Sequence, residues 1–401
     1  MGDEGALVIG AGAAGLATAA MLQRAGVKTA VLERSDRIGS SWLSRYDSLR
    51  LNTLRGMSDL PGFRCDSYYG TFPSARDWAA YLQRYAEHFP LDVRLGVQVE
   101  RIELGRLEWR LHTSAGELCA PAVVLATGYD HDPKLPAWPG LEGFTGELIH
   151  AAEYRNAKPF EGRRVLVAGA GNSGSEIAGE LARNGAAKVW LAVRTPPSLF
   201  PRRWLGLSTN RLAVLLDILP TPLADQMGLI GQRIITGNLS RYGLPFPTDG
   251  MKTRLRRDGI AATVDGGFVK ALKRGQIEVV PAVKSFDGKV VELDGATVRP
   301  DAVIAATGFR RGLEPLVGHL GVLDERGVPV VHGERTHAGA PGLYFVGFDA
   351  LSSGQLRLMS RDARAVARMV AYRRPSLPAL GRASAGRRVL RLPGTPRTRP
   401  A

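Results

Sequence analysis

A glycine-rich motif of the form GxGxxG occurs twice in this chain, each time directly after an apolar run and directly before a stretch typical of a helix. The glycines are Gly10, Gly12 and Gly15 in the first motif, and Gly169, Gly171 and Gly174 in the second. In this spacing the first glycine makes a tight turn, the second lets the backbone approach a pyrophosphate, and the third lets the helix pack on the strand. The N–H groups at the start of that helix favour phosphates. Two such units, about 160 residues apart, predict an α/β chain that binds two dinucleotides.

The residue at the end of the next strand indicates which dinucleotide each unit binds. Glu33 ends the strand expected after the first motif. A carboxylate there accepts hydrogen bonds from two ribose hydroxyls, which favours FAD or NAD over a nucleotide with a 2′-phosphate. Arg194 stands at the matching place after the second motif, where a guanidinium pairs with the 2′-phosphate of NADPH. The alternative for Arg194 is a surface arginine beside a loop.

Composition excludes several classes of protein. With 401 residues, 44% hydrophobic and 23% charged, the chain is long enough for two or three domains and unlike a disordered, collagenous or coiled-coil sequence. Its two cysteines, Cys65 and Cys119, exclude a disulfide scaffold and a CxxC redox pair. The seven histidines show no metal-ligand spacing, so we expect no metal.

The net charge of +15 is concentrated near the C-terminus, where residues 371–401 hold eight arginines and no acid. No aromatic-interleaved basic stripe accompanies this charge, so we expect no specific nucleic-acid partner. No apolar run reaches the roughly 18 residues that span a bilayer. The N-terminus carries acids where a signal peptide has bases. We therefore expect a soluble, cytoplasmic protein, with a mobile tail from about residue 375 and no transmembrane segment.

The spacer between the two units carries a third motif. Phe144, Gly146, His150 and Tyr154 form FxGxxxHxxxY, which resembles the fingerprint of the flavin-containing monooxygenases. Baeyer–Villiger monooxygenases have tryptophan at the position of Tyr154. The resemblance covers residues 5–370, and residues 250–312 are similar to the plant indole-3-pyruvate monooxygenase (YUCCA-type) branch.

This resemblance implies a fold and a domain order. The expected fold is α/β with two Rossmann-like dinucleotide-binding domains, each a three-layer ββα arrangement, the NADPH domain inserted into the FAD domain. We place the FAD domain at 1–155 and 305–401 and the NADPH domain at 156–304. Two strands that end in Ala-Thr-Gly, at 122–128 and 302–308, mark the places where the chain crosses between the domains.

The resemblance also implies an activity. We expect an FAD-dependent enzyme that uses NADPH and O₂ and oxygenates a small organic substrate through a flavin C4a-hydroperoxide. The substrate is an amine or sulfide, a carbonyl compound, or a 2-oxo acid such as indole-3-pyruvate. The alternatives are an NADPH oxidase or flavin-dependent reductase without substrate oxygenation, and Baeyer–Villiger oxygenation. A homodimer is a further hypothesis.

Asn52 is the residue that we expect to take part in the chemistry, because the stretch 46–53 resembles the family's segment that brings an asparagine to the flavin. Arg50, Arg55 and Arg76 are candidate partners of a substrate carboxylate, and His150 is expected to set the geometry of the linker. The residues expected to contact the two cofactors are Gly10, Gly12, Ala14, Gly15, Glu33, Arg34, Trp42, Thr127, Gly128, Gly169, Gly171, Asn172, Ser173, Gly174, Arg194, Thr307, Gly308 and Gly347.

Overall fold

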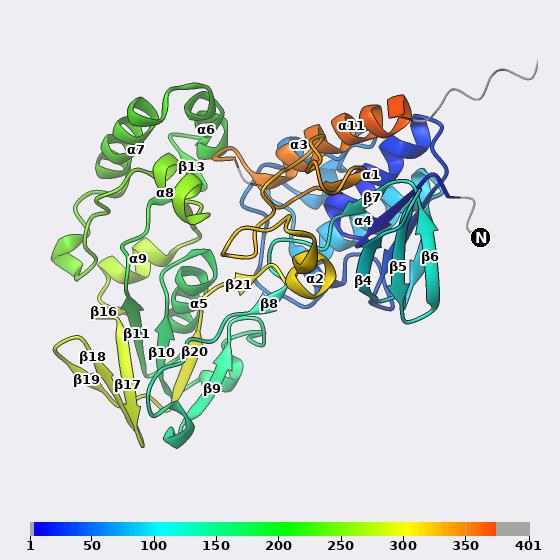
Figure 1. The fold of residues 1–401 in the computed structure, drawn as a ribbon. Coiled ribbons are helices and arrows are strands. Elements are labelled where there is room, and N and C mark those ends of the chain that lie inside the picture. Colours follow the sequence, from blue (N-terminus) through cyan, green and yellow to red (C-terminus); the bar gives the residue numbers. More distant parts are fainter. Residues whose placement is uncertain (1–3, 350, 374–401) are drawn as a thin grey trace, which may run out of the picture.

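Two five-stranded parallel sheets form the frame of the molecule in a computed structural model that describes residues 4–349 and 351–373 (Figure 1). The first sheet has the order β22 (Leu343–Phe345), β7 (Val123–Leu125), β1 (Ala6–Ile9), β2 (Thr29–Glu33) and β3 (Asp92–Leu95). The second has the order β16 (Glu278–Pro281), β11 (Lys188–Val193), β10 (Arg164–Ala168), β20 (Ala302–Ala305) and β9 (Glu147–His150).

Each sheet lies between a layer of helices and a small antiparallel sheet. In the first unit, α1 (Ala13–Arg24), α4 (Ala75–His88) and α11 (Gln355–Arg373) form one core with Val8, Val31 and Val124. The strands β4 (Val99–Leu104), β5 (Trp109–Thr113) and β6 (Gly116–Ala120) form another core with the alternate strand residues, Leu7 and Leu32 among them. Successive side chains of a strand point to opposite faces, so both faces are apolar and both are covered.

The second unit repeats this arrangement. Val165 and Val167 of β10 pack toward α5 (Asn172–Arg183) and α9 (Phe268–Lys273). Leu166, between them, packs toward a three-stranded sheet formed by β17 (Val283–Asp287), β18 (Val290–Leu293) and β19 (Thr297–Val298). The expected three-layer ββα fold with two dinucleotide-binding units is confirmed.

The second unit is inserted between β7 and β22 of the first sheet. The chain leaves after β7 and returns after β20, and the two crossing segments pair as antiparallel strands β8 (Asp132–Pro133) and β21 (Phe309–Arg310). Strand β9 pairs with β20 in the second sheet although it precedes residue 155. The domain boundaries at 155 and 305 stay a prediction.

The remaining helices and strands belong to neither five-stranded sheet. They include α2 (Ser40–Leu43), α3 (Arg55–Ser58), β12 (Leu199–Pro201), β13 (Arg203–Trp204), β14 (Leu207–Ser208), α6 (Thr209–Ile218), α7 (Thr221–Thr236), α8 (Met251–Asp258), β15 (Thr263–Asp265) and α10 (Glu314–Val317). Single 3₁₀ turns occur at Ser67–Tyr69, Leu141–Gly143, Lys158–Phe160, Ser240–Tyr242 and Gly318–Leu320. Figure 1 shows α6 and α7 at the end of the second unit that lies opposite the sheet of β17, β18 and β19.

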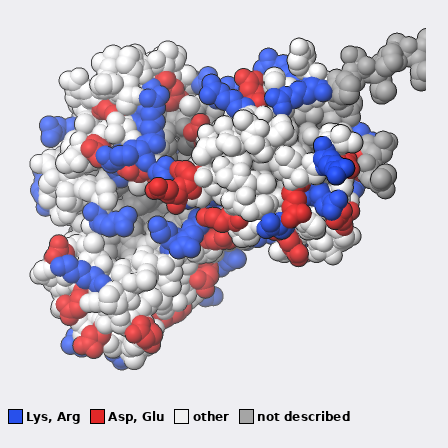
Figure 2. Space-filling model, viewed as in Figure 1, with Lys and Arg blue, Asp and Glu red and all other residues white. Residues whose placement is uncertain are grey.

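Basic and acidic side chains are interspersed over the face drawn in Figure 2, and the surface over α6 and α7 is largely uncharged. The arginine-rich stretch from residue 374 onward, and with it the predicted mobile tail, lies outside the described residues. Among the described residues, no helix combines the length and apolarity needed to cross a membrane.

Candidate active site

The first glycine motif forms a tight turn between β1 and α1. Gly10 has a φ of +103°, and a Cβ there would lie 2.6 Å from the carbonyl oxygen of Ala126. A Cβ on Gly15 would lie 1.8 Å from the carbonyl oxygen of Gly10. Gly12 differs, because nothing lies within 4 Å of its Cβ position. Gly12 is also the N-cap of α1 and makes no side-chain cap. The turn thus leaves open space in front of the free N–H groups of a helix, which fits a pyrophosphate.

The second motif has the same geometry between β10 and α5. Gly169 has a φ of +115°, and its Cβ would lie 2.4 Å from the carbonyl oxygen of Ala306. A Cβ on Gly174 would lie 1.8 Å from the carbonyl oxygen of Gly169, whereas nothing lies within 4 Å of the Cβ position of Gly171. Each motif therefore packs against the end of a neighbouring strand and faces open space at its second glycine. We call these turns the first and second cradles.

Glu33 closes one side of the first cradle. Its Oε2 accepts a hydrogen bond from the N–H of Ala11 at 2.7 Å, and its Oε1 accepts one from the N–H of Ser35 at 2.9 Å. Each carboxylate oxygen has a second lone pair, so Glu33 keeps acceptors for ribose hydroxyls. This geometry fits the role predicted for it.

The other residues predicted for the first cofactor differ in their surroundings. A Cβ on Gly347 would lie 3.2 Å from the Cβ of Ala14, so these two positions meet beside α1. The hydroxyl of Thr127 is buried and has no partner among the described residues.

Trp42 is half-buried and packs edge-on against Trp78, with ring centroids 6.2 Å apart. Gly128 follows at the crossing point, with a φ of +97°, and Arg34 is exposed.

Around the second cradle, Arg194 is exposed directly after β11, and Ser173 lies in the first turn of α5. The hydroxyl of Thr307 donates to the carbonyl oxygen of Lys134 on the other crossing segment.

His150 contacts Gly308, on the segment by which the chain returns to the first unit. It is buried, and its Nε2 lies 3.1 Å from the carbonyl oxygen of Gly308. Its Nδ1 accepts a hydrogen bond from the N–H of Ala152 at 3.1 Å. The neutral ring with a proton on Nε2 satisfies both contacts. Burial lowers the pKa of His150 below its usual 6.5. The contacts fit the linker role expected for this histidine.

Asn52 lies at the junction of the two units. Its Nδ2 donates to the Oδ1 of Asn172 at 3.2 Å, and its Oδ1 accepts from the Nη2 of Arg202 at 3.4 Å. Asn172 is the first residue of α5 and a predicted contact of the second cofactor. Two residues chosen from separate motifs, one for each cofactor, are thus in direct contact.

Four further residues meet at this junction, and none of them was predicted as a site residue. The hydroxyl of Tyr46 donates to Glu176 Oε2 at 2.6 Å, and that of Ser48 donates to Glu180 Oε2 at 2.5 Å. Both acids lie on α5, and both hydroxyls lie in the stretch that carries Asn52. The available signal in the sequence was a pair of glutamates four residues apart, among small and apolar residues of the helix that follows the second motif.

The three arginines considered for a substrate carboxylate have different environments. Arg76 is exposed and pairs with Asp47 at 3.5 Å. Arg50 is exposed and donates to the carbonyl oxygen of Phe72 at 3.2 Å. Arg55 is half-buried, and its Nη1 is buried without a partner in the described part of the chain.

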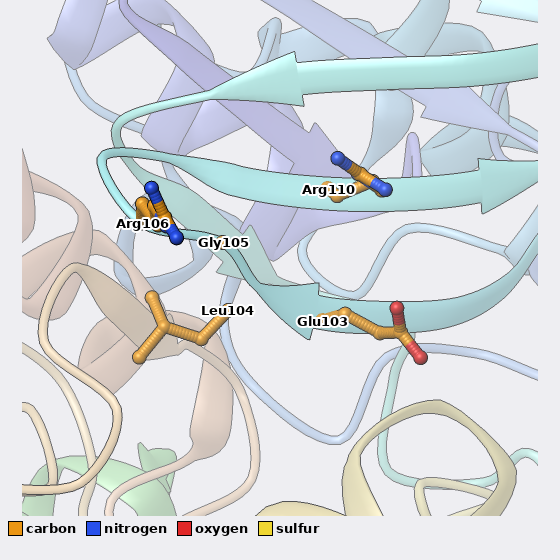
Figure 3. A pocket seen from close by; sticks show the side chains of 5 residues that line it. All are labelled: Glu103, Leu104, Gly105, Arg106 and Arg110. Carbon is orange, nitrogen blue, oxygen red and sulfur yellow. The ribbon is translucent and has the colours of Figure 1, made fainter.

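A separate hollow lies on the β4–β5 hairpin and contains no predicted site residue (Figure 3). Its lining residues are Glu103, Leu104, Gly105, Arg106 and Arg110. Within residues 4–349 and 351–373, no group of three or more His, Cys, Asp or Glu side chains is placed to hold a metal ion. Cys65 and Cys119 are both free.

Two cradles of this geometry on one chain define a flavoprotein oxidoreductase that uses two dinucleotides. Residues 7–204 match the pyridine nucleotide-disulphide oxidoreductase family. The structure is similar to the flavin-containing monooxygenase from Stenotrophomonas maltophilia, with a TM-score of 0.72, 25% identity, and coverage of 93% of this chain and 99% of that one.

Sequence comparison identifies the branch of these oxidoreductases to which the chain belongs. The chain is 37% identical over 351 residues to the indole-3-pyruvate monooxygenase YUCCA1 of Oryza sativa subsp. japonica, covering 86% of each protein. It is 35% identical to the probable indole-3-pyruvate monooxygenase YUCCA9 of Arabidopsis thaliana, covering 86% of this chain and 84% of that protein. The chain belongs to the flavin-containing monooxygenase family, in the branch of the YUCCA proteins. It is an FAD- and NADPH-dependent monooxygenase, as expected from the sequence.

Proposed function

We propose that this monooxygenase carries out the oxidative decarboxylation of a 2-oxo acid of the indole-3-pyruvate class. FAD occupies the first cradle and NADPH the second. The contact between Asn52 and Asn172 is the observation that carries this proposal. It brings the residue expected beside the flavin to the start of the helix expected to bind the pyridine nucleotide. The names of the relatives supply the substrate class.

The bound cofactors supply hydride and the site at which O₂ is activated. The chain contributes binding, orientation and exclusion of water. The free N–H groups of α1 and α5 hold the phosphates, and Glu33 accepts from a ribose. Asn52 is a neutral donor and acceptor whose orientation is fixed by Asn172 and Arg202, so it presents a defined polar group at the junction.

The overall reaction balances as one 2-oxo acid, one O₂, one NADPH and one proton giving the acid shortened by one carbon, CO₂, H₂O and NADP⁺. The bond between the carboxylate and the carbonyl carbon breaks. One oxygen atom of O₂ enters the new carboxylate, and the other leaves as water.

The test is a stoichiometry measured on the flavin-loaded protein under ¹⁸O₂. Because H₂O₂ decarboxylates 2-oxo acids without an enzyme, catalase is present in one arm and absent in the other. We expect one NADPH consumed per indole-3-acetate formed, with ¹⁸O in its carboxylate, in both arms. Product that disappears with catalase, together with one H₂O₂ per NADPH when both the 2-oxo acid and catalase are left out, identifies an NADPH oxidase. A cyclic ketone converted to a lactone in preference to the 2-oxo acid identifies Baeyer–Villiger oxygenation.

We propose further that the enzyme is a homodimer through an apolar face on α6 and α7. Exposed large apolar residues gather there, namely Leu212, Leu215, Ile218, Leu223, Met227, Ile230 and Ile234. A face of this kind is unusual on a monomer and typical of homodimer interfaces. A second copy supplies the same apolar surface around a two-fold axis.

The cytoplasm is the compartment that fits the two free cysteines, and fractionation of cells that express the tagged protein tests it.

A further inference from the structure

Glu176 is a nearly buried carboxylate one turn into α5, directly beyond the second glycine motif. Its side chain is 10% exposed. It accepts a hydrogen bond from the hydroxyl of Tyr46 at 2.6 Å and forms an ion pair with Arg202 Nη2 at 3.0 Å. A charge in such a place is stable only with partners, and a paired charge holds those partners in turn.

Arg202 connects this carboxylate to the junction. The same Nη2 that pairs with Glu176 donates to the Oδ1 of Asn52 at 3.4 Å. On the other side, Arg202 lies over the ring of Phe72, with its Cζ 5.9 Å from the ring centroid. Arg202 therefore reaches Asn52 from a position fixed by an ion pair and an aromatic ring.

The other end of the Asn52 amide is fixed independently. Asn172 Oδ1 accepts a hydrogen bond from the N–H of Val264 at 2.8 Å, and Asn172 Nδ2 donates to the carbonyl oxygen of Ala262 at 3.3 Å. These backbone contacts determine which atom of Asn172 is the oxygen. Asn52 must then present its NH₂ group to Asn172 and its oxygen to Arg202.

We propose that Glu176 is a positioning residue that orients the amide of Asn52 through Arg202. The inference rests on the proposed function, because it gives Asn52 a place in the chemistry. Among the described residues, the side chain of Glu176 makes hydrogen bonds to Tyr46 and Arg202 and none to Asn52 or to the side chain of Asn172. Its effect is transmitted by the guanidinium that it holds.

Glu180 provides a matched control. It lies one turn further along α5, is also buried, and also contacts the stretch that carries Asn52, through Ser48. Within the described residues it makes no hydrogen bond or ion pair with Arg202, so it connects the same two segments without reaching the amide of Asn52. If variants at Glu176 and Glu180 behave differently, the cause is the orientation of Asn52 and not the attachment of α5 to the stretch that carries Asn52.

The experiment compares Glu176→Gln with Glu180→Gln in the flavin-loaded enzyme. The first readout is NADPH oxidation with release of H₂O₂ in the absence of any organic substrate. We expect this leak to rise about fivefold or more in Glu176→Gln, since a hydrogen bond to a charged group is lost. In Glu180→Gln we expect the leak to stay near the wild-type value. The double variant with Asn52→Ala should leak no more than Asn52→Ala alone, because Glu176 acts only through Asn52.

Arg202→Lys is the second variant, and it keeps the buried carboxylate paired. A lysine places one ammonium where the guanidinium has a fork, so it cannot hold the same geometry toward Asn52. In Arg202→Lys we expect the same rise in H₂O₂ release as in Glu176→Gln. We expect the apparent melting temperature of Arg202→Lys to stay near the wild-type value. An unchanged leak in both Glu176→Gln and Arg202→Lys, or an equal rise in Glu180→Gln, would overturn the proposal. The readout needs no substrate, so a wrong substrate class would appear only in the ¹⁸O₂ stoichiometry.

Discussion

Among single residues, Glu33 is preorganised to bind a ribose, because contacts within the protein already fix its carboxylate. Two backbone N–H groups hold its carboxylate at the rim of the first cradle. Hydrogen bonds to a charged group are stronger than neutral ones, so Glu33→Gln should weaken FAD binding about tenfold. Fluorescence titration of the apoprotein with FAD measures this. Glu87→Gln, an exposed position on α4, is the control. Equal affinity in Glu33→Gln and wild type would remove Glu33 from the site.

His150 should make the stability of the fold depend on pH. Burial lowers its pKa in the folded protein below 6.5, so the fold favours the neutral ring. Its contribution to the free energy of unfolding is complete above about pH 6.5 and is lost as the pH falls through the folded-state pKa. Between pH 7.5 and 5.5 the apparent melting temperature of wild type should fall about 2 °C more than that of His150→Gln.

Two groups need control in this measurement. The pKa of half-buried His332 is also lowered by burial, so the His150 variant removes only part of the slope. His88 is exposed on α4, and His88→Gln is the control for replacing a histidine away from the crossing segments. A slope that is the same in wild type and His150→Gln would show that the ring accepts a proton without cost.

At the scale of elements, the two cradles make the assignment of the cofactors testable. A methyl group on Gly12 or Gly171 meets no protein atom within 4 Å, so Gly12→Ala and Gly171→Ala should both fold. The methyl group occupies the space expected for a pyrophosphate. We expect Gly12→Ala to lose FAD affinity and Gly171→Ala to raise the KM for NADPH, each by about tenfold or more.

The reverse pattern would exchange the two cofactors between the cradles. Gly15→Ala is a useful contrast, because its methyl group would lie 1.8 Å from the carbonyl oxygen of Gly10. That variant should fail to fold, as judged by circular dichroism. A folded Gly15→Ala protein would contradict the packing of α1 on the turn.

The cradles could be predicted because their information is local. Gly10 and Gly169 require positive φ values, and Gly15 and Gly174 require close helix packing, each within a few residues of sequence. The contacts of Asn52 could not be predicted in the same way. Asn172 and Arg202 are 120 and 150 residues away along the chain, and only the placement of one sheet against the other brings them together. Glu176 was missed for that reason, although it adjoins a motif that was recognised.

At the scale of the whole molecule, the α6–α7 face should set the oligomeric state. Ile218 is 78% exposed on α6 and Ile234 is 67% exposed on α7. We expect the wild type to have twice the chain mass of 43.1 kDa by light scattering, and Ile218→Glu with Ile234→Glu to give the single-chain mass. Leu107→Glu, at a 94% exposed position on the β4–β5 turn, should leave the mass unchanged. A wild-type monomer that binds anionic vesicles would assign the face to a lipid surface instead.

The fold brings the two cradles together at Asn52, where we propose that the reaction with O₂ is controlled. Rapid mixing of the NADPH-reduced holoenzyme with oxygen tests it most directly, with absorbance followed in the near ultraviolet. We predict a transient absorption band in wild type whose lifetime is shortened about tenfold or more in Asn52→Ala, since a preorganised polar contact is lost. A band with the same lifetime in both proteins, or no band in the wild type, would contradict the account.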